Sequence, residues 1–530
     1  MERTITIGTR GSDLALWQAN FVKAALAKIN INAQLKVIKT QGDNILNLRL
    51  DKLEGKGFFT KELEEQLLDG SIDLAVHSHK DLPTKNPEGL VIAAVSGREN
   101  PSEIILILKD CVDASKKLSV KHNGIVGTSS NRRQSQLHAI RPDLEFENLR
   151  GNVPTRIQKL RDEDYDAIIM AKAGAERLKI DLSEFYVEEI EPTAEMVPSP
   201  AQGVLAIQIR ENDKELFDIL QNLNDKEVAE KIGVERKVLN LFDGGCHMPL
   251  GCFCEKDEEG IFHAWTTKSI DQDEFPDRLY LTSNTTEGLA EKIVSKFDLA
   301  NRKLPKTVFI SRELSEHSYF RKALEKHKIK IEDRSLIRTV PTIHKLDSYI
   351  FKQVDWIFFS SKNGIEYFFE LNPLLPKGIK FGVVGRGSEE ALKQRGKKVD
   401  FIGESSDTEE ISKEFAQIAN GQTILFPLAK DSLRSIQKEL AKDTKIIEVV
   451  IYETILEENV AQTYADVLVF TSPSNVEAYF EENLLEPNQQ VVAIGKSTGK
   501  KFEEMGVKYI LPASPDEIGL AEVVFGIDVL

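Results

Sequence analysis

Cysteine is scarce in this chain, with four residues among 530. So low a count argues against a framework of disulfide bonds, which supports folds with small cores. It leaves two uses for the thiols that are present, a reactive group or a metal site. The four are Cys111, Cys246, Cys252 and Cys254.

Long apolar runs are also missing. No stretch is long enough to cross a bilayer, and the opening MERTITIGTRGSDLALW lacks the basic and then apolar order of a secretory signal. We therefore expect a cytoplasmic protein without a membrane partner.

An excess of positive charge is absent as well. The formal net charge is -16, which opposes nonspecific nucleic-acid binding because polyphosphates are recognised by electropositive surfaces. Six arginines nevertheless share one position, each beside a turn or helix start that follows a strand-like run. Any one of them alone is most simply a surface residue, but the set suggests a site for a small polyanion. They are Arg10, Arg132, Arg133, Arg150, Arg156 and Arg177.

Strand-like and helix-like segments alternate from the start of the chain, as in α/β folds. Residues 4–9 and 35–40 are expected to form strands, with a helix at 14–29 between them. A similar series follows residues 98–102, and a proline-rich return at 191–200 leads into a strand that would rejoin the first lobe. Two such crossings between two lobes would form a hinge around a cleft.

A chain of this length should contain several compact lobes, since single hydrophobic cores stop growing well below it. We expect a first lobe of residues 1–100 and 200–220 and a second of residues 101–199. Residues 221–298 are predicted to form a small α+β lobe, and residues 299–306 a linker.

The segment Ile72–Pro83, IDLAVHSHKDLP, joins an apolar β-type run to a dense polar cluster before a proline turn. In open α/β domains, ligands bind at the carboxyl ends of strands. Chemistry is therefore expected at this loop, although a solvated turn is the simpler alternative. The polar residues of the loop are His77, Ser78, His79, Lys80 and Asp81.

The second half contains an internal repeat. Residues 355–370, DWIFFSSKNGIEYFFE, resemble residues 466–481, DVLVFTSPSNVEAYFE, and residues 381–399 parallel 491–509 at nearly the same offset. Duplication is the natural explanation. We predict two doubly wound lobes, one of residues 307–340 and 454–530 and the other of residues 341–453.

Cys246 follows two glycines and precedes HMPLG, a setting that leaves a side chain accessible on a tight loop. It could be a covalent attachment point. Zinc is the rival, because Cys246, His247, Cys252 and Cys254 are all potential ligands, but their crowding fits two separated ligand pairs poorly. A merely structural cysteine is the third possibility.

Several motifs appear together in residues 1–300: GTRGSDLALWQ, GKGFFTKELE, AVHSHKDLP, GTSSNRRQSQL, LRGNVPTRI, PSPAQGVLAI and GGCHMPLG. In this order they resemble porphobilinogen deaminase, also called hydroxymethylbilane synthase. His79 stands where that family often has methionine, and His247 where glutamine is common. The resemblance implies a two-lobed clamshell like that of periplasmic binding proteins, followed by a small α+β domain.

The same resemblance implies a dipyrromethane cofactor held by Cys246 through a thioether, with Asp81 as the main catalytic group beside Lys80. Asp81 would stabilise the cationic azafulvene formed as ammonia leaves porphobilinogen. The implied cofactor-binding residues are Cys246, Lys80, Asp81, Thr128, Ser129, Arg132, Arg133, Arg150 and Gly151. The implied substrate-binding residues are Arg10, Ser12, Ser78, Arg150, Arg156, Arg177 and Gln202.

Residues 305–530 resemble uroporphyrinogen-III synthase, which implies a two-lobed flavodoxin-like α/β domain whose crossings fall near 339–342 and 452–454. Tyr452 is then the candidate acid for loss of the substrate hydroxyl. The candidate carboxylate-binding hydroxyls follow strands, where ordinary helix capping is an equally good explanation. They are Ser472, Ser474, Ser497 and Thr498.

We therefore predict a monomeric bifunctional enzyme that makes hydroxymethylbilane from porphobilinogen and cyclises it to uroporphyrinogen III. It would need no metal, nucleic acid or membrane. One alternative is a deaminase with a degenerate second half. The other is a cytoplasmic anion-binding protein, which the thiol loop and the Lys80–Asp81 pair disfavour.

Overall fold

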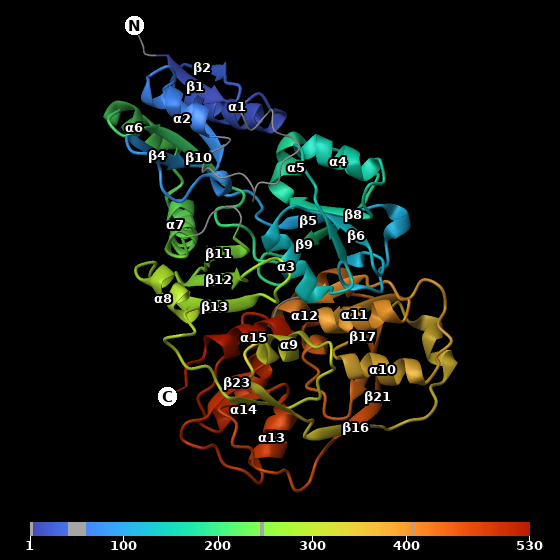
Figure 1. Cartoon of the computed structure of the whole chain (residues 1–530). Coiled ribbons are helices and arrows are strands. Elements are labelled where there is room, and N and C mark those ends of the chain that lie inside the picture. Colours follow the sequence, from blue (N-terminus) through green and yellow to red (C-terminus); the bar gives the residue numbers. More distant parts are fainter. Residues whose placement is uncertain (1–3, 41–59, 244–247, 404–407, 530) are drawn as a thin grey trace. The chain divides into compact units, whose positions relative to one another are not determined.

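The computed structural model describes residues 4–40, 60–243, 248–403 and 408–529. The chain divides into two compact units, Met1–Arg302 and Lys303–Leu530 (Figure 1). Within the described ranges, no helix is both long and apolar enough to span a bilayer. Five sheets, with helices around most of them, confirm the α/β class that the alternating pattern predicts.

The first sheet has the strand order β2-β1-β3-β10-β4, in which β10 runs antiparallel to both neighbours. The predicted edge strand at 35–40 instead spans Ala33–Val37, because its partner β1 ends at Thr9, opposite Val37. The elements are β1 Ile5–Thr9, α1 Asp13–Lys28, β2 Ala33–Val37, α2 Lys61–Leu68, β3 Leu74–Ser78, β4 Leu90–Val95, β10 Leu205–Arg210 and α6 Lys214–Leu220.

The second sheet has the order β7-β6-β8-β5-β9. Its strands come in the sequence between β4 and β10, which both belong to the first sheet. The return of β10 to the first sheet agrees with the expectation from the proline-rich segment. The elements are β5 Glu103–Ile107, β6 Ile125–Gly127, α3 Asn131–Ile140, β7 Glu145–Glu147, α4 Val153–Arg161, β8 Ala167–Ala171, α5 Lys172–Leu178 and β9 Tyr186–Ile190.

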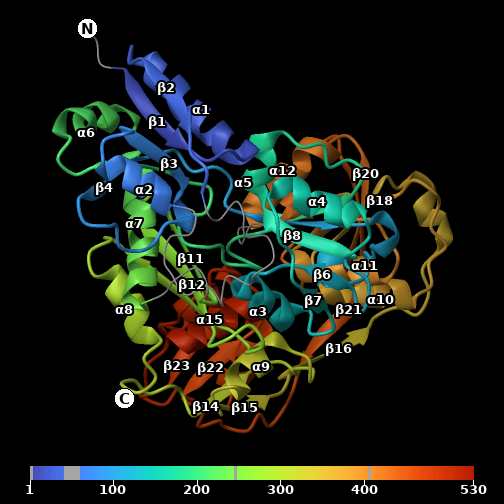
Figure 2. The same ribbon diagram turned by 45° about the horizontal axis from the view of Figure 1, so that its top comes forward.

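The small lobe of the first unit consists of helix α7, three antiparallel strands and helix α8. Helix α7 lies against both β4 and β11 (Figures 1 and 2). Strand β11 was not predicted, because Cys252, Phe253 and Cys254 are all buried and give no alternation of polar and apolar residues. The elements are α7 Lys226–Leu241, β11 Leu250–Lys256, β12 Phe262–Lys268, β13 Asp277–Ser283 and α8 Leu289–Lys296.

The second unit contains a parallel sheet, β15-β14-β22-β23, and a six-stranded sheet, β16-β21-β20-β17-β18-β19. The antiparallel pair β16 and β21 contains both of the predicted crossings. The elements are β14 Thr307–Ile310, α9 Tyr319–Glu325, β15 Lys330–Asp333, β16 Ile337–Pro341, β17 Trp356–Phe359, α10 Lys362–Glu370, β18 Lys380–Val384, α11 Arg386–Gln394, β19 Phe401–Gly403, α12 Thr408–Ala419, β20 Thr423–Ala429, β21 Lys445–Leu456, β22 Val467–Phe470, α13 Pro473–Phe480, β23 Gln490–Ala493, α14 Lys496–Glu504 and α15 Glu517–Gly526.

The internal repeat is visible in the structure as two copies of one strand and helix arrangement. β17 and α10 correspond to β22 and α13, and β18 and α11 correspond to β23 and α14. Equivalent serines cap the first helix of each copy: Ser361 accepts from the amide of Gly364, and Ser472 from that of Asn475. The duplication therefore extends to the local hydrogen bonding.

Candidate functional site

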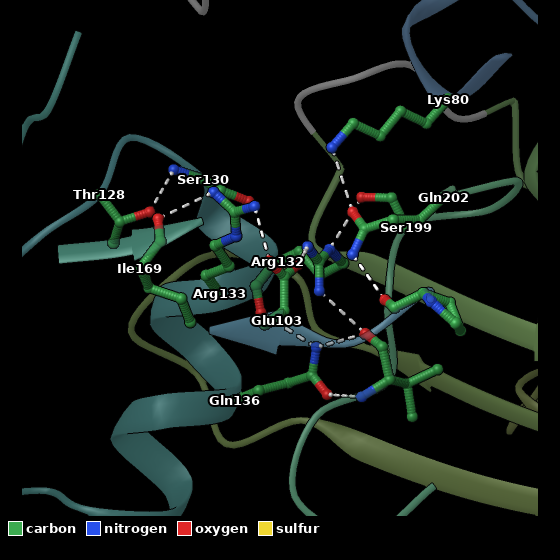
Figure 3. A network of polar contacts seen from close by, with 12 residues as sticks. Lys80, Glu103, Thr128, Ser130, Arg132, Arg133, Gln136, Ile169, Ser199 and Gln202 are labelled. Carbon is green, nitrogen blue, oxygen red and sulfur yellow. Dashed lines mark hydrogen bonds and ion pairs between the residues drawn. The ribbon is translucent and has the colours of Figure 1, made fainter. Parts of the chain in front are cut away.

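Lys80 and Asp81 lie in a short 3-10 turn, His79–Asp81, directly after the carboxyl end of β3. The Lys80 Nζ atom donates to Oε1 of Gln202 at 3.1 Å (Figure 3). Gln202 precedes β10, and its own amide nitrogen donates to the carbonyl of Pro101 at 2.8 Å. Lys80 is thus anchored to both segments that connect the two larger lobes, while the Asp81 residue is exposed.

Two neighbouring arginines from the first turn of α3 share one carboxylate. Glu103, at the start of β5, accepts from Arg132 through Oε1 at 2.5 Å and from Arg133 through Oε2 at 2.8 Å (Figure 3). Arg132 also donates to Ser199 Oγ at 3.0 Å. All three charged residues are buried, so they form an ion cluster inside the protein.

Burial and neighbouring charges together set the protonation of Glu103 and Lys80. Burial alone would raise the pKa of Glu103, but the charges of Arg133 and Arg132 outweigh it and lower the pKa to about 2. Burial lowers the pKa of Lys80 to about 8, against the opposing effect of Asp81. Glu103 is therefore ionised at neutral pH, and Lys80 is mostly charged.

Arg156 and Arg177 lie within the electrostatic reach of Asp81. Burial, with repulsion from Arg133, lowers the pKa of Arg156 to about 10, and Asp81 opposes this shift. Burial also lowers the pKa of Arg177, which Glu99 and Asp81 oppose. Both guanidinium groups remain charged at neutral pH and are held by carbonyls, Arg156 by that of Gly151 at 2.8 Å and Arg177 by that of Gly203 at 3.0 Å.

The remaining expected residues of the second lobe lie at strand ends or in the turns that follow them. Thr128 Oγ1 accepts from the amide of Ser130 at 3.2 Å, and Ser129 Oγ donates to the carbonyl of Leu149 at 2.9 Å. Arg150 is half-buried, and Gly151 has a φ of 118°, which favours glycine.

The first lobe contributes Arg10, Ser12 and Ser78. Arg10 directly follows β1, and its charge helps to lower the pKa of His77, after the larger effect of burial. Ser12 caps α1, and Ser78 Oγ accepts from Gln18 Nε2 at 2.8 Å. Strand ends of both lobes therefore supply the polar residues of this region.

The Nε atom of Arg133 is buried and has no hydrogen-bond partner among the described residues. A buried donor without an acceptor is costly. The donor and the surplus of cations over carboxylates around Glu103 fit a ligand that brings several negative oxygens.

Sequence reasoning missed the carboxylates that hold this region together. Glu103 stands in the run SEIILIL, where one charged residue in an otherwise apolar strand was the available signal. Glu235 of α7 is fully buried and pairs with Arg98 at 2.7 Å. It also accepts from the amides of Ala201 and Cys254, and only the fold brings these segments together.

Cys246 and His247 fall outside the described residues, between α7 and β11. Cys252 and Cys254 lie within β11 and are fully buried. Burial raises the pKa of both thiols, that of Cys254 to about 12.

Tyr452 lies near the end of β21, in the second unit. Its hydroxyl is 2.9 Å from Ser361 Oγ, and its ring stacks on that of Tyr367 with 5.2 Å between centroids. Burial raises the pKa of Tyr452, so its hydroxyl keeps its proton at neutral pH. A hydroxyl that keeps its proton and is held by a hydrogen bond can serve as an acid.

The four candidate hydroxyls of the second unit lie at the amino ends of two helices. Ser472 is the cap of α13, and it also accepts from the side-chain amide of Asn475 at 2.8 Å. Ser474 lies in the first turn of α13, and Ser497 and Thr498 in that of α14. Ser497 is exposed and Thr498 is buried, so Ser497 is the more accessible of that pair.

Comparison with known families gives two separate matches. Residues 5–218 match the family described as "Porphobilinogen deaminase, dipyromethane cofactor binding domain". Residues 318–522 match the family described as "Uroporphyrinogen-III synthase HemD".

Curated relatives match the first unit over most of their own length. The porphobilinogen deaminase of Fusobacterium nucleatum is 42% identical over 267 residues, which cover 49% of this chain and 86% of that protein. The porphobilinogen deaminase of Maridesulfovibrio salexigens is 45% identical over 261 residues, with 49% and 82% covered.

Solved structures give more distant matches. The uroporphyrinogen-III synthetase of Helicobacter pylori is 18% identical, covers 41% of this chain and 98% of its own, and has a TM-score of 0.32. An arginine-specific periplasmic binding protein of Salmonella typhimurium is 12% identical, with 43% and 94% covered and a TM-score of 0.27.

Replacing Glu103 by glutamine should destabilise the first unit in a pH-dependent way. Its pKa is lowered from 4.5 to about 2, so at ~1.4 kcal/mol per pKa unit its ionisation stabilises the fold by about 3 kcal/mol at neutral pH. A lowered carboxyl pKa gives stability that is present above the ordinary pKa and lost on acidification. The difference between E103Q and wild type should therefore shrink as pH falls from 4.5 toward about 2.

Urea unfolding of both proteins across this pH range measures the difference. E230Q is the matched control, because Glu230 forms a partly exposed pair with Lys256 at 3.3 Å. Such pairs contribute about 1 kcal/mol or less. An equal loss in the two variants, or a loss independent of pH, would contradict the assigned role of Glu103.

Proposed function

This chain belongs to the porphobilinogen deaminase family, and from that membership we propose that Lys80, Asp81 and the arginines around Glu103 form its deaminase site. The observation that carries the proposal is the geometry of the Lys80–Asp81 turn. Lys80 donates a hydrogen bond to Gln202. The charges of Asp81 and Glu103 raise the pKa of Lys80, and the charge of Arg133 lowers it. The proposed catalytic carboxylate, Asp81, thus lies within electrostatic reach of buried cations.

The enzyme is bifunctional. Its deaminase part makes hydroxymethylbilane from four porphobilinogen molecules with release of ammonia. Its synthase part converts this product to uroporphyrinogen III with inversion of the last ring.

Asp81 is the proposed catalytic residue of the deaminase. Its carboxylate accepts hydrogen bonds from the pyrrole N–H of porphobilinogen. It stabilises the positive charge that develops on the pyrrole and its methylene carbon as the protonated amino group breaks its C–N bond and leaves as ammonia. A carboxylate already fixed where the charge appears needs no reorganisation during the reaction. The exposed position of Asp81 leaves it accessible to substrate.

Lys80 and the arginines are the proposed carboxylate-binding residues. Each porphobilinogen brings an acetate and a propionate, so negative charge accumulates as the chain lengthens. Charge-assisted hydrogen bonds to guanidinium groups offset it, at about 1.5–3 kcal/mol each. Thr128, Ser129, Gly151, Gln202, Ser12 and Ser78 supply neutral contacts beside Arg10, Arg132, Arg133, Arg150, Arg156 and Arg177.

The residues present fit a dipyrromethane, whose carboxylates match the unpartnered Nε donor of Arg133 and the cations beside it. The domain is a dipyrromethane-cofactor-binding domain. We propose that Cys246 holds this group through a thioether, on the segment that follows α7. When bound, the group supplies the primer on which pyrroles are added, while Arg132, Arg133 and Arg150 bind its carboxylates.

In the synthase part, Tyr452 is the proposed acid. Its hydroxyl proton passes to the departing hydroxyl of the bilane, which leaves as water, and Ser361 holds the phenol in place at 2.9 Å. The hydroxyls at the amino ends of α13 and α14 are proposed to bind substrate carboxylates together with the helix amides. Ser497 is exposed and Thr498 is buried, while Ser472 and Ser474 are both half-buried.

We further propose that the enzyme acts as a cytoplasmic monomer, since one chain carries both activities. Hydroxymethylbilane can cyclise without inversion in solution. Tethering the two parts raises the effective concentration of the second site and so limits this loss.

The thioether proposal predicts a covalent mass on the first unit. Purified wild-type protein, measured as an intact mass, should carry an increment equal to a dipyrromethane, and the Cys246→Ser variant should lack it. Cys111→Ser is the matched control, because the Cys111 thiol donates a hydrogen bond to Asp166 at 3.2 Å and has no proposed role in the site. An adduct that persists in the Cys246 variant, or disappears in the Cys111 variant, would refute the assignment.

The acid proposal predicts a change in product isomer. Tyr452→Phe keeps the ring that stacks on Tyr367 but removes the proton, so enzymatic cyclisation should slow by about 10²–10⁴-fold. Chromatography of the products should then show mainly the uninverted isomer. Tyr464→Phe removes an exposed hydroxyl of the same unit and should leave the isomer ratio unchanged. Uroporphyrinogen III as the main product of the Tyr452 variant would exclude this role.

A further inference from the structure

Arg236 of α7 binds the turn that carries Lys80 and Asp81. Its Nη1 atom donates to the carbonyl of His79 at 3.4 Å, and its Nη2 atom to those of Leu82 at 2.9 Å and Pro83 at 2.5 Å. These acceptors flank the two catalytic residues on both sides. A single guanidinium group from the small lobe therefore spans the catalytic turn.

Support for the turn from its own backbone is limited. It is one turn of 3-10 helix, closed by the amide of Leu82 on the carbonyl of His79 at 3.2 Å, and such turns have weak hydrogen-bond geometry. A second bond joins the amide of His79 to the carbonyl of Val204 at 2.9 Å. Arg236 adds support after Asp81, because it binds the carbonyls of Leu82 and Pro83.

A cavity of about 390 Å³ adjoins the turn. His79, Leu82 and Pro83 line one part of it, and Ile232 and Arg236 of α7 line another. Close packing normally prevents a loop from shifting. On the side of this cavity the turn lacks close packing, so there the hydrogen bonds of Arg236 help to hold its position.

The preceding residue of α7 binds the opposite side of the same site. Glu235 pairs with Arg98, and Arg98 Nε donates to the carbonyl of Gln202 at 3.1 Å. Gln202 in turn accepts from Lys80. Two consecutive residues of one helix thus hold both the Lys80–Asp81 turn and the Gln202 turn.

We propose that Arg236 is a positioning residue for deamination, which fixes the Lys80–Asp81 turn relative to α7. The inference rests on the proposed roles of Lys80 and Asp81. Helix α7 ends at Leu241, five residues before Cys246. The same helix therefore sets the place of the catalytic carboxylate and leads into the segment proposed to carry the growing chain.

The test compares Arg236→Met with Lys237→Met in the full-length protein carrying its cofactor, as verified by intact mass. Lys237 is the next residue of α7, and it is half-exposed in an ion pair with Glu291. We expect Arg236→Met to lower kcat for porphobilinogen consumption by about 10- to 100-fold, as misplacing a reacting group does. KM should change less than kcat, because the carboxylate-binding arginines remain. Lys237→Met should match wild type.

The pH profile gives a second readout that a merely structural role would not alter. Burial lowers the pKa of Lys80 to about 8, so a turn released toward solvent should raise it. The alkaline limb of kcat/KM should then move to higher pH in Arg236→Met. Arg236→Lys keeps a donor and should recover part of kcat. If the methionine variant does not fold, the lysine variant and the pH profile carry the test.

Two results would overturn the proposal. One is an Arg236→Met or Arg236→Lys protein with lowered melting temperature but wild-type kcat, KM and pH profile. The other is an equal loss of activity in Lys237→Met. A different result would show that the underlying site assignment is wrong. In that case the Asp81→Asn variant, with Arg236 unchanged, would keep full activity.

Discussion

The proposed deaminase site depends on one buried ion cluster, the carboxylate of Glu103 between the guanidinium groups of Arg132 and Arg133. Two cations placed side by side in a protein interior repel each other and lose their hydration. A single carboxylate that bonds to both makes their burial tolerable and fixes their direction. Because it neutralises only one of the two charges, the cluster keeps a net attraction for anions.

Other parts of the first unit extend this arrangement. Burial lowers the pKa of Lys80, while Asp81 remains exposed. Glu235 and Arg236 of α7 join the small lobe to the turns that hold Lys80 and Gln202. The site is therefore assembled by residues from all three lobes of the unit.

The second unit uses different chemistry for a related substrate. Its candidate residues are a buried phenol, a serine that caps a helix and hydroxyls at helix amino ends. Neutral groups of this kind suit a reaction in which a hydroxyl must gain a proton. The duplicated strand and helix arrangement repeats the capping serine, Ser361 in one copy and Ser472 in the other.

Sequence patterns predicted the features that depend on local order. The alternation of strands and helices gave the α/β class, and the segment AQGVLAIQIR was expected to rejoin the first lobe, as β10 does. The polar cluster after Ile72 predicted a turn at the carboxyl end of a strand, and His79–Asp81 follows β3 in this way. Strand β11 escaped prediction because burial on both faces removes the alternation that marks a strand.

Long-range partners could not be predicted in the same way. Glu103 is separated from Arg132 by 29 positions, and Arg236 from His79 by 157. No local pattern links such residues, because their contact depends on how whole lobes pack. The arginines could be recognised as a set from their shared position after strands, whereas the carboxylates that organise them required the fold.

The central claim is that Asp81, joined to this buried set of cations, carries the deamination. Its most direct test is the rate of porphobilinogen consumption by Asp81→Asn beside wild type, both carrying the dipyrromethane by intact mass. The account predicts a loss of about 10²-fold or more, as for other groups that stabilise developing charge. A holo variant that consumes porphobilinogen within a few-fold of the wild-type rate would contradict it.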